Sequence, residues 1–104
     1  MKVLHQGHRY ELSNFQKLNE VGQTIQFIHK VPTSDDPSVL ETIEDGTTNE
    51  EFLEVLIDRI KFLQAKFPCR ENAIVITKLE ESLMWLNKRT ADRIARDVEG
   101  KHIA

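Results

Sequence analysis

The second half of the chain has the hydrophobic spacing of two amphipathic helices. Apolar residues recur every three or four positions between Phe52 and Phe67, as they do on one face of a helix. Residues 47–51 read Thr-Thr-Asn-Glu-Glu, which contains two overlapping capping boxes. Pro68 disfavours helical geometry at the residue before it. A second periodic run predicts another helix, which we expect to end near Gly100.

The short connection between these helices requires an antiparallel hairpin. The predicted packing stripe of the first helix is Phe52, Val55, Leu56, Ile60, Leu63 and Phe67, and that of the second is Ile76, Leu79, Leu83, Leu86 and Thr90. Further apolar residues lie off both stripes, at Leu53, Ile57, Phe62, Ile74, Val75, Met84, Trp85 and Ile94. This surplus favours oligomerisation through the helices. The alternative is that the N-terminal part of the same chain covers the second face.

The first half of the chain has the pattern of short strands and turns. Residues 8–12 alternate polar and apolar side chains, the period of a half-buried strand. Two more strands are predicted, one at residues 23–31, stopped by Pro32, and one at residues 39–43. We therefore predict an α+β fold that forms one domain over residues 1–104. A small antiparallel β-sheet in residues 1–46 is followed by a long two-helix hairpin in residues 47–100.

Length and charge exclude several classes of protein. The chain has 104 residues and a net charge of −3, which disfavours binding to long DNA or RNA. It has no apolar run long enough to span a membrane, and its first residues do not resemble a signal peptide. The single cysteine, Cys69, suits a reducing cytoplasm. We expect it to be a small, buried turn residue.

The mean charge hides a basic cluster near the end of the second helix. Arg89, Arg93 and Arg96 are spaced at i, i+4 and i+7, so they share a helical face. Guanidinium groups bind phosphates through two parallel hydrogen bonds, which makes this face a candidate anion site. The alternative is that these arginines favour the helix dipole and pair with acidic neighbours on the same helix. Those neighbours are Asp92, Asp97 and Glu99.

Three other residues could contact a base or ribose. Phe62 and Tyr10 could stack on a base, and the Asn72 amide could bind a base edge. In the predicted hairpin, Phe62 and Asn72 lie at the turn end, roughly 25 Å along the second helix from Arg89. A small ligand could meet Phe62, Asn72, Arg89 and Arg93 together only where hairpins from two chains pack together.

The sequence predicts no metal site, no cofactor and no catalytic residues. His5 and His8 would point to opposite faces of a strand, and His29 and His102 are isolated in the sequence. We see no acid/base pair, nucleophile motif or glycine-rich phosphate loop. An enzyme that degrades a phosphodiester is therefore disfavoured.

Several segments of the hairpin together resemble the phage anti-defence hairpin family, which includes sponges for Thoeris and CBASS signalling. The resemblance covers about residues 47–100. Its segments are Thr47-Thr48-Asn49-Glu50-Glu51, Leu56-Ile57-Asp58-Arg59, Cys69-Arg70-Glu71-Asn72-Ala73, Thr77-Lys78-Leu79-Glu80-Glu81 and Met84-Trp85-Leu86-Asn87-Lys88-Arg89-Thr90. The strands that precede the hairpin are more similar to the Thoeris branch than to the all-helical anti-CBASS branch.

The resemblance implies a phage protein of the host cytoplasm that assembles as a homo-hexamer. Such proteins bind immune second messengers without cleaving them: glycocyclic ADP-ribose, and in some relatives cyclic di- or trinucleotides. By motif, Phe62 would stack on a base, Asn72 would be the polar residue that opens the second helix, and Arg89 and Arg93 would hold phosphates. Arg96 and Tyr10 remain candidates that no family motif supports. The competing hypothesis is a structural hairpin protein that binds a host protein through its apolar stripes.

Overall fold

The structure is a computed structural model that describes residues 1–96. These residues form two compact units, which we call the β-unit (residues 1–48) and the hairpin unit (residues 49–96). The order of elements is five strands followed by two helices. The predicted α+β class, with antiparallel β-structure before a helical hairpin, is confirmed. The one small sheet of the prediction is divided into two sheets.

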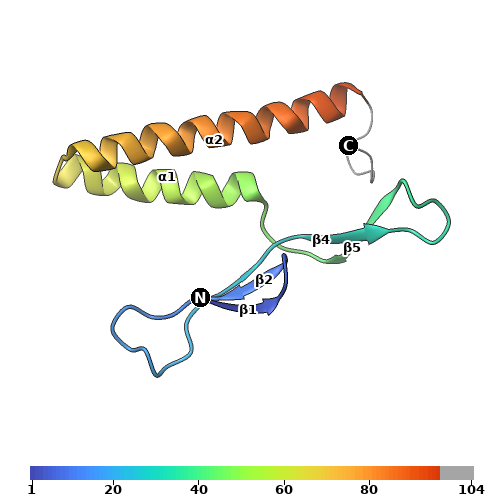
Figure 1. Cartoon of the computed structure of the whole chain (residues 1–104), viewed down its shortest axis with the longest axis horizontal. Helices are drawn as coiled ribbons and strands as arrows, with labels where there is room; N and C mark the ends of the chain where they lie inside the picture. The colour runs from blue at the N-terminus through green and yellow to red at the C-terminus, as the bar shows by residue number, and fades with distance from the viewer. Residues whose placement is uncertain (97–104) are drawn as a thin grey trace. The chain divides into compact units, whose positions relative to one another are not determined.

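The hairpin unit consists of α1 (Asn49–Lys66) and α2 (Arg70–Ala95), which run antiparallel to each other (Figure 1). Because α1 begins at Asn49, Thr48 and Glu51 occupy the N-cap and N3 positions of one predicted capping box. The helix α2 ends earlier than predicted, with Arg96 as its C-cap. The predicted stop, Gly100, lies outside the described residues.

The face of α1 that packs on α2 differs from the predicted stripe. Ile57 is 7% exposed and is the one buried hydrophobic residue among residues 1–96. Four members of the predicted stripe are exposed in the single chain, namely Phe52, Val55, Leu56 and Phe67. The inward stripe is Leu53, Ile57, Ile60 and Leu63, so the prediction is correct for Ile60 and Leu63 only. Both stripes of α1 have helical spacing, so periodicity alone could not choose between them. On α2, every residue of the predicted stripe is partly buried.

The turn between the helices is held by one glutamine side chain. The Gln64 amide donates to the carbonyl oxygen of Cys69 at 3.0 Å, and its Oε1 accepts from the backbone N–H of Cys69 at 3.0 Å. Cys69 is the N-cap of α2, and its Sγ accepts from the backbone N–H of Asn72 at 3.4 Å. Cys69 is exposed, so the prediction of a buried cysteine is wrong. Its capping position requires it to face the open end of the helix.

Replacing Gln64 with alanine should lower the free energy of unfolding by about 1–2 kcal/mol, because two hydrogen bonds to the turn are lost. Gln64→Glu keeps the acceptor for the Cys69 N–H and loses the donor, so it should cost about half as much. Urea denaturation at a fixed protein concentration measures both. Equal stability of the alanine variant and the unaltered protein would show that the turn does not depend on Gln64.

The β-unit contains two small antiparallel sheets. One has the order β1 (Lys2–His5), β2 (Arg9–Glu11), β3 (Thr24–Gln26), and the other pairs β4 (His29–Pro32) with β5 (Leu40–Glu44). The sequence did not predict β1, and the predicted strand 23–31 is divided between β3 and β4. The strand divides because the backbone changes its hydrogen-bond partners. The Phe27 N–H donates to the carbonyl oxygen of His8 at 2.7 Å, and the Ile28 N–H donates to the carbonyl oxygen of Thr47 at 2.9 Å.

The β-unit has almost no core of its own. No hydrophobic residue among residues 1–48 is buried, and Phe15 and Val21 are 95% and 79% exposed. Gly46 lies so close to the backbone of Gln26 that a Cβ atom would meet its carbonyl oxygen at 2.3 Å. Backbone pairing therefore holds this unit together more than side-chain burial does. Among the described residues, neither helix is long and apolar enough to cross a membrane.

Candidate ligand site of the helical hairpin

The three arginines of the predicted anion site differ in burial. Arg93 is 7% exposed and continues the inward stripe of α2 after Leu86 and Thr90. Arg89, one turn earlier, is exposed, and Arg96 caps α2 through its backbone N–H, which donates to the carbonyl oxygen of Asp92 at 3.0 Å. Arg89 therefore offers a guanidinium on the surface, whereas Arg93 is buried.

The acidic neighbours of this cluster are only partly available to the arginines. The Asp92 carboxylate pairs with the ammonium of Lys88 at 3.0 Å. Asp97 and Glu99, the other predicted partners, lie outside the described residues. At the same end of the hairpin, the Thr90 hydroxyl lies 3.5 Å from the Glu50 carboxylate, which fixes this part of α2 against the first turn of α1.

Phe62 and Asn72 lie at the opposite end of the hairpin. Phe62 is 53% exposed near the end of α1, and the Lys66 ammonium lies 4.5 Å from its ring centroid. A base could therefore stack only on the ring face that Lys66 leaves open. Asn72 is half-buried in the first turn of α2, where the helix dipole is positive and favours an anion.

Within the hairpin unit, Phe62 and Asn72 lie too far from Arg89 to share one small pocket. Asn72 and Arg89 are separated by roughly 25 Å of helix at 1.5 Å per residue, as the sequence predicts. Tyr10 belongs to the β-unit, where its ring packs edge-on against Phe27 with centroids 6.0 Å apart. The proposed contact of Tyr10 with a ligand has no support from this packing.

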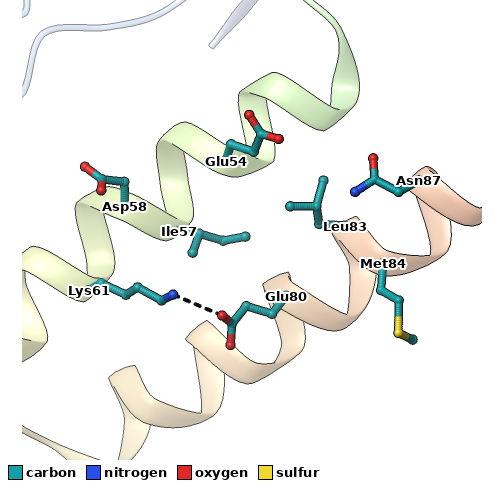
Figure 2. A pocket seen from close by; sticks show the side chains of 8 residues that line it. All are labelled: Glu54, Ile57, Asp58, Lys61, Glu80, Leu83, Met84 and Asn87. Carbon is teal, nitrogen blue, oxygen red and sulfur yellow. Dashed lines mark ion pairs between the residues drawn. The ribbon is translucent and has the colours of Figure 1, made fainter.

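The hairpin unit does contain a groove that sequence reasoning missed. It has a volume of about 580 Å³. Figure 2 shows the side chains of α1 and α2 that line it. Its lining residues are Glu54, Ile57, Asp58, Lys61, Glu80, Leu83, Met84 and Asn87. On each helix these residues are spaced at i, i+3, i+4 and i+7, so helical periodicity could have identified the two facing rows.

The charge of the groove is wrong for a phosphate ligand. Glu54, Asp58 and Glu80 contribute three carboxylates, against one ammonium from Lys61. That ammonium is already paired with Glu80 at 3.0 Å (Figure 2). Carboxylates repel an anion, so the groove and the basic end of α2 are separate features with different chemistry.

Comparison with known proteins places the hairpin in a family. Residues 21–91, more than half of the chain, match the model of the Acb2/Tad1 hairpin domain. The chain belongs to the Acb2/Tad1 hairpin family. It is also similar to a Bacillus phage SBSphiJ7 protein named "Thoeris anti-defense 1", with 54% identity over 65 residues. That match covers 62% of this chain and 46% of the relative, so the chain spans about half the length of that protein.

The Acb2/Tad1 match begins at residue 21, so β1 and β2 lie outside it. A histidine cluster of the β-unit lies partly in this region, since it joins His5 of β1 and His8 of the following turn to His29 of β4. His8 stacks on His29 with centroids 3.6 Å apart and an interplanar angle of 16°, and His5 lies about 5 Å from both rings, with centroid distances of 5.1 and 5.0 Å. The predictions that His5 and His8 face opposite ways and that His29 is isolated are therefore wrong.

His5 and His8 lie on the same side because a turn separates them, whereas the prediction placed both on one continuous strand. The backbone N–H of His8 donates to the carbonyl oxygen of His5 at 2.9 Å, so the two histidines flank a β-turn. Gly7 has φ +84° there, a left-handed conformation that favours glycine. Partial desolvation and the adjacent His29 and His5 rings lower the pKa of His8, while Glu44 opposes the shift. The stack therefore favours neutral imidazole at position 8.

Proposed function

We propose that this chain is a phage anti-defence sponge, which sequesters a cyclic nucleotide second messenger of the host. The observation that carries the proposal is the Acb2/Tad1 hairpin match together with the similarity to Thoeris anti-defense 1. The messenger that fits the resemblance best is glycocyclic ADP-ribose, with cyclic di- and trinucleotides as further ligands. A small anion needs only a local basic cluster, so the net charge of −3 is compatible with this function.

The hairpin geometry supports a binding site shared between chains. The phosphate-binding candidate Arg89 and the stacking candidate Phe62 lie at opposite ends of one hairpin. When two hairpins pack antiparallel, the turn end of one lies beside the open end of the other. A shared site of this kind would combine Phe62 and Asn72 of one chain with Arg89 and Arg93 of a second chain, in a homo-hexamer.

Exposed apolar side chains on the helices support this assembly. Met84, Trp85 and Ile94 of α2 are 56%, 57% and 62% exposed in the single chain. Water contact with so much apolar surface is unfavourable, and burial against another copy would remove it. Trp85 lies one turn before Arg89 and so shares its helical face, which would bring the interface next to the anion site.

The proposal is tested by calorimetry of the full chain with glycocyclic ADP-ribose, cyclic dinucleotides and cyclic trinucleotides. We expect tight binding of at least one of them, followed by recovery of the intact ligand after heat denaturation. Binding of none of these ligands would refute the sponge. Recovery of cleavage products would favour a phosphodiesterase instead.

Removing one negative charge from the acidic groove should leave messenger binding almost unchanged. In Asp58→Asn the groove keeps its shape and loses one negative charge, so we expect the Kd for glycocyclic ADP-ribose to change by less than about threefold, equivalent to well under 1 kcal/mol. Calorimetry measures the change. A tenfold loss of affinity would move the ligand site from the basic end of α2 to the groove.

Trp85→Glu should break the assembly, because a charge cannot be buried in an apolar interface without a partner. We expect light scattering to report a smaller oligomer, whereas Trp85→Phe should retain the mass of the unaltered protein. An unchanged mass for Trp85→Glu would place the interface elsewhere.

The same exposed side chains favour a second function, the binding of a host protein through the hairpin. Light scattering of the unaltered chain separates the two. A monomer that binds no cyclic nucleotide would favour host-protein binding, whereas a stable oligomer that binds a messenger favours the sponge.

A further inference from the structure

Three side chains of the β-unit that are far apart in the sequence lie close together in the structure. His5 lies at the end of β1, His29 at the start of β4 and Glu44 at the end of β5. The Glu44 Oε1 atom lies 4.0 Å from His5 Nδ1 and 3.8 Å from His29 Nδ1. The potential ligand atoms of all three residues fall within 4.8 Å of one another. Imidazole nitrogens and a carboxylate oxygen are the donors that zinc accepts in His₂Glu sites.

Two irregularities in the sheets are located at this cluster. The register of β1 against β2 shifts between Val3 and His5. The register of β4 against β5 shifts at His29, which pairs with Glu44. A β-bulge re-aims the side chains next to it. Both sheets therefore interrupt their regular pairing where they supply a potential ligand.

The cluster also contains a polar atom that the protein leaves unsatisfied. His29 Nδ1 is buried and makes no hydrogen bond to any group of residues 1–96, and its side chain is 13% exposed. The distance of 3.8 Å to Glu44 exceeds hydrogen-bond length. The second carboxylate oxygen of Glu44 lies 3.6 Å from the Arg9 guanidinium, which leaves Oε1 directed at the two imidazoles.

We propose that His5, His29 and Glu44 bind a divalent transition-metal cation of the zinc class. Metal bonds of about 2.0–2.2 Å would draw the three donor atoms about 1 Å closer together. The His5 and Glu44 side chains have room for this movement, since they are 43% and 36% exposed. With three protein ligands, the fourth position is left for water. His8, stacked on His29, orients that ring and is not a ligand.

The cation would stabilise the β-unit, which gains little stability from side-chain burial. Residues 1–48 have no buried hydrophobic residue, and domains with so little core commonly depend on a structural metal. The site joins β1 of one sheet to β4 and β5 of the other. Binding free energy at such a junction becomes folding free energy, so the metal would act as a cross-link between the two sheets.

The test is titration of the full-length, chelator-treated protein with Zn²⁺ by calorimetry, together with thermal unfolding with and without Zn²⁺. We expect one Zn²⁺ per chain and a higher Tm. His29→Ala, His5→Ala and Glu44→Gln should each weaken binding by at least about tenfold and abolish the Tm shift. Glu41→Gln removes the same charge from an exposed position of β5 and is the matched control.

A second control separates this site from other histidines. His102→Gln, outside the described residues, should bind Zn²⁺ like the unaltered protein. Circular dichroism of each variant without metal checks that it is folded. The proposal is overturned if the unaltered protein takes up no stoichiometric Zn²⁺. It is also overturned if folded Glu44→Gln binds Zn²⁺ as tightly as Glu41→Gln, which would show that the cluster is only a set of ion pairs.

Discussion

Replacing Arg89 and Arg93 together with glutamate should reduce the affinity for glycocyclic ADP-ribose by at least about 100-fold. Each arginine would donate charge-assisted hydrogen bonds to a phosphate, worth about 1.5–3 kcal/mol. A factor of ten in affinity corresponds to about 1.4 kcal/mol. Glutamate also replaces attraction by repulsion, so the loss exceeds that of simple removal. Isothermal titration calorimetry measures the effect directly.

The burial of Arg93 requires a second variant, because a charge reversal at 7% exposure also threatens folding. Arg89→Gln changes an exposed residue and should weaken binding by about tenfold or more. Lys88→Gln removes the same charge one position earlier on α2 and should change affinity by less than about threefold. Equal losses of affinity in these two variants would show that binding depends only on the total positive charge at this end of α2 and not on Arg89 itself.

Replacing Ile57 with alanine should lower the free energy of unfolding by about 2–5 kcal/mol, as expected for truncation of a buried isoleucine. Ile57 is the most buried hydrophobic side chain among residues 1–96, and it packs in the interface between α1 and α2. With so few other buried residues, the hairpin has little capacity to compensate. Urea denaturation at a fixed protein concentration gives the value, since an oligomer's stability depends on concentration.

Two variants calibrate this effect. Ile57→Val removes one methylene group and should cost about 0.5–1.5 kcal/mol. Leu18→Ala removes comparable apolar atoms from a side chain that is 70% exposed, so the change should stay within about 0.5 kcal/mol. If Ile57→Ala were no more destabilising than Leu18→Ala, the packing of α1 on α2 would contribute little to stability.

The hairpin was largely predictable because its signals are local. Pro68 and the Thr-Thr-Asn-Glu-Glu segment mark helix ends through neighbouring residues, and the spacing from Ile76 to Thr90 identifies the inward face of α2. The face of α1 was not predictable in the same way. Two apolar stripes compete there, and only contact with α2 selects the one that contains Ile57.

The β-unit was less predictable because its strands are short and its contacts are distant in sequence. Strand β4 follows β3 after only two residues, yet the two belong to different sheets. The backbone partners that divide them, His8 and Thr47, are set by the fold. In the hairpin, the spacing along each helix could identify the two rows that line the groove, but the pairing of Lys61 with Glu80 is decided only when the helices pack.

The sequence by itself determined the α+β order of elements, the hairpin, its family resemblance and the basic residues at the end of α2. These features depend on periodicity, capping and motifs, which neighbouring residues carry. The tertiary structure alone decided that Arg93 is buried while Arg89 is exposed, and that His5, His29 and Glu44 meet. The physical reason is that register, turns and helix packing bring together residues whose spacing along the chain carries no such information.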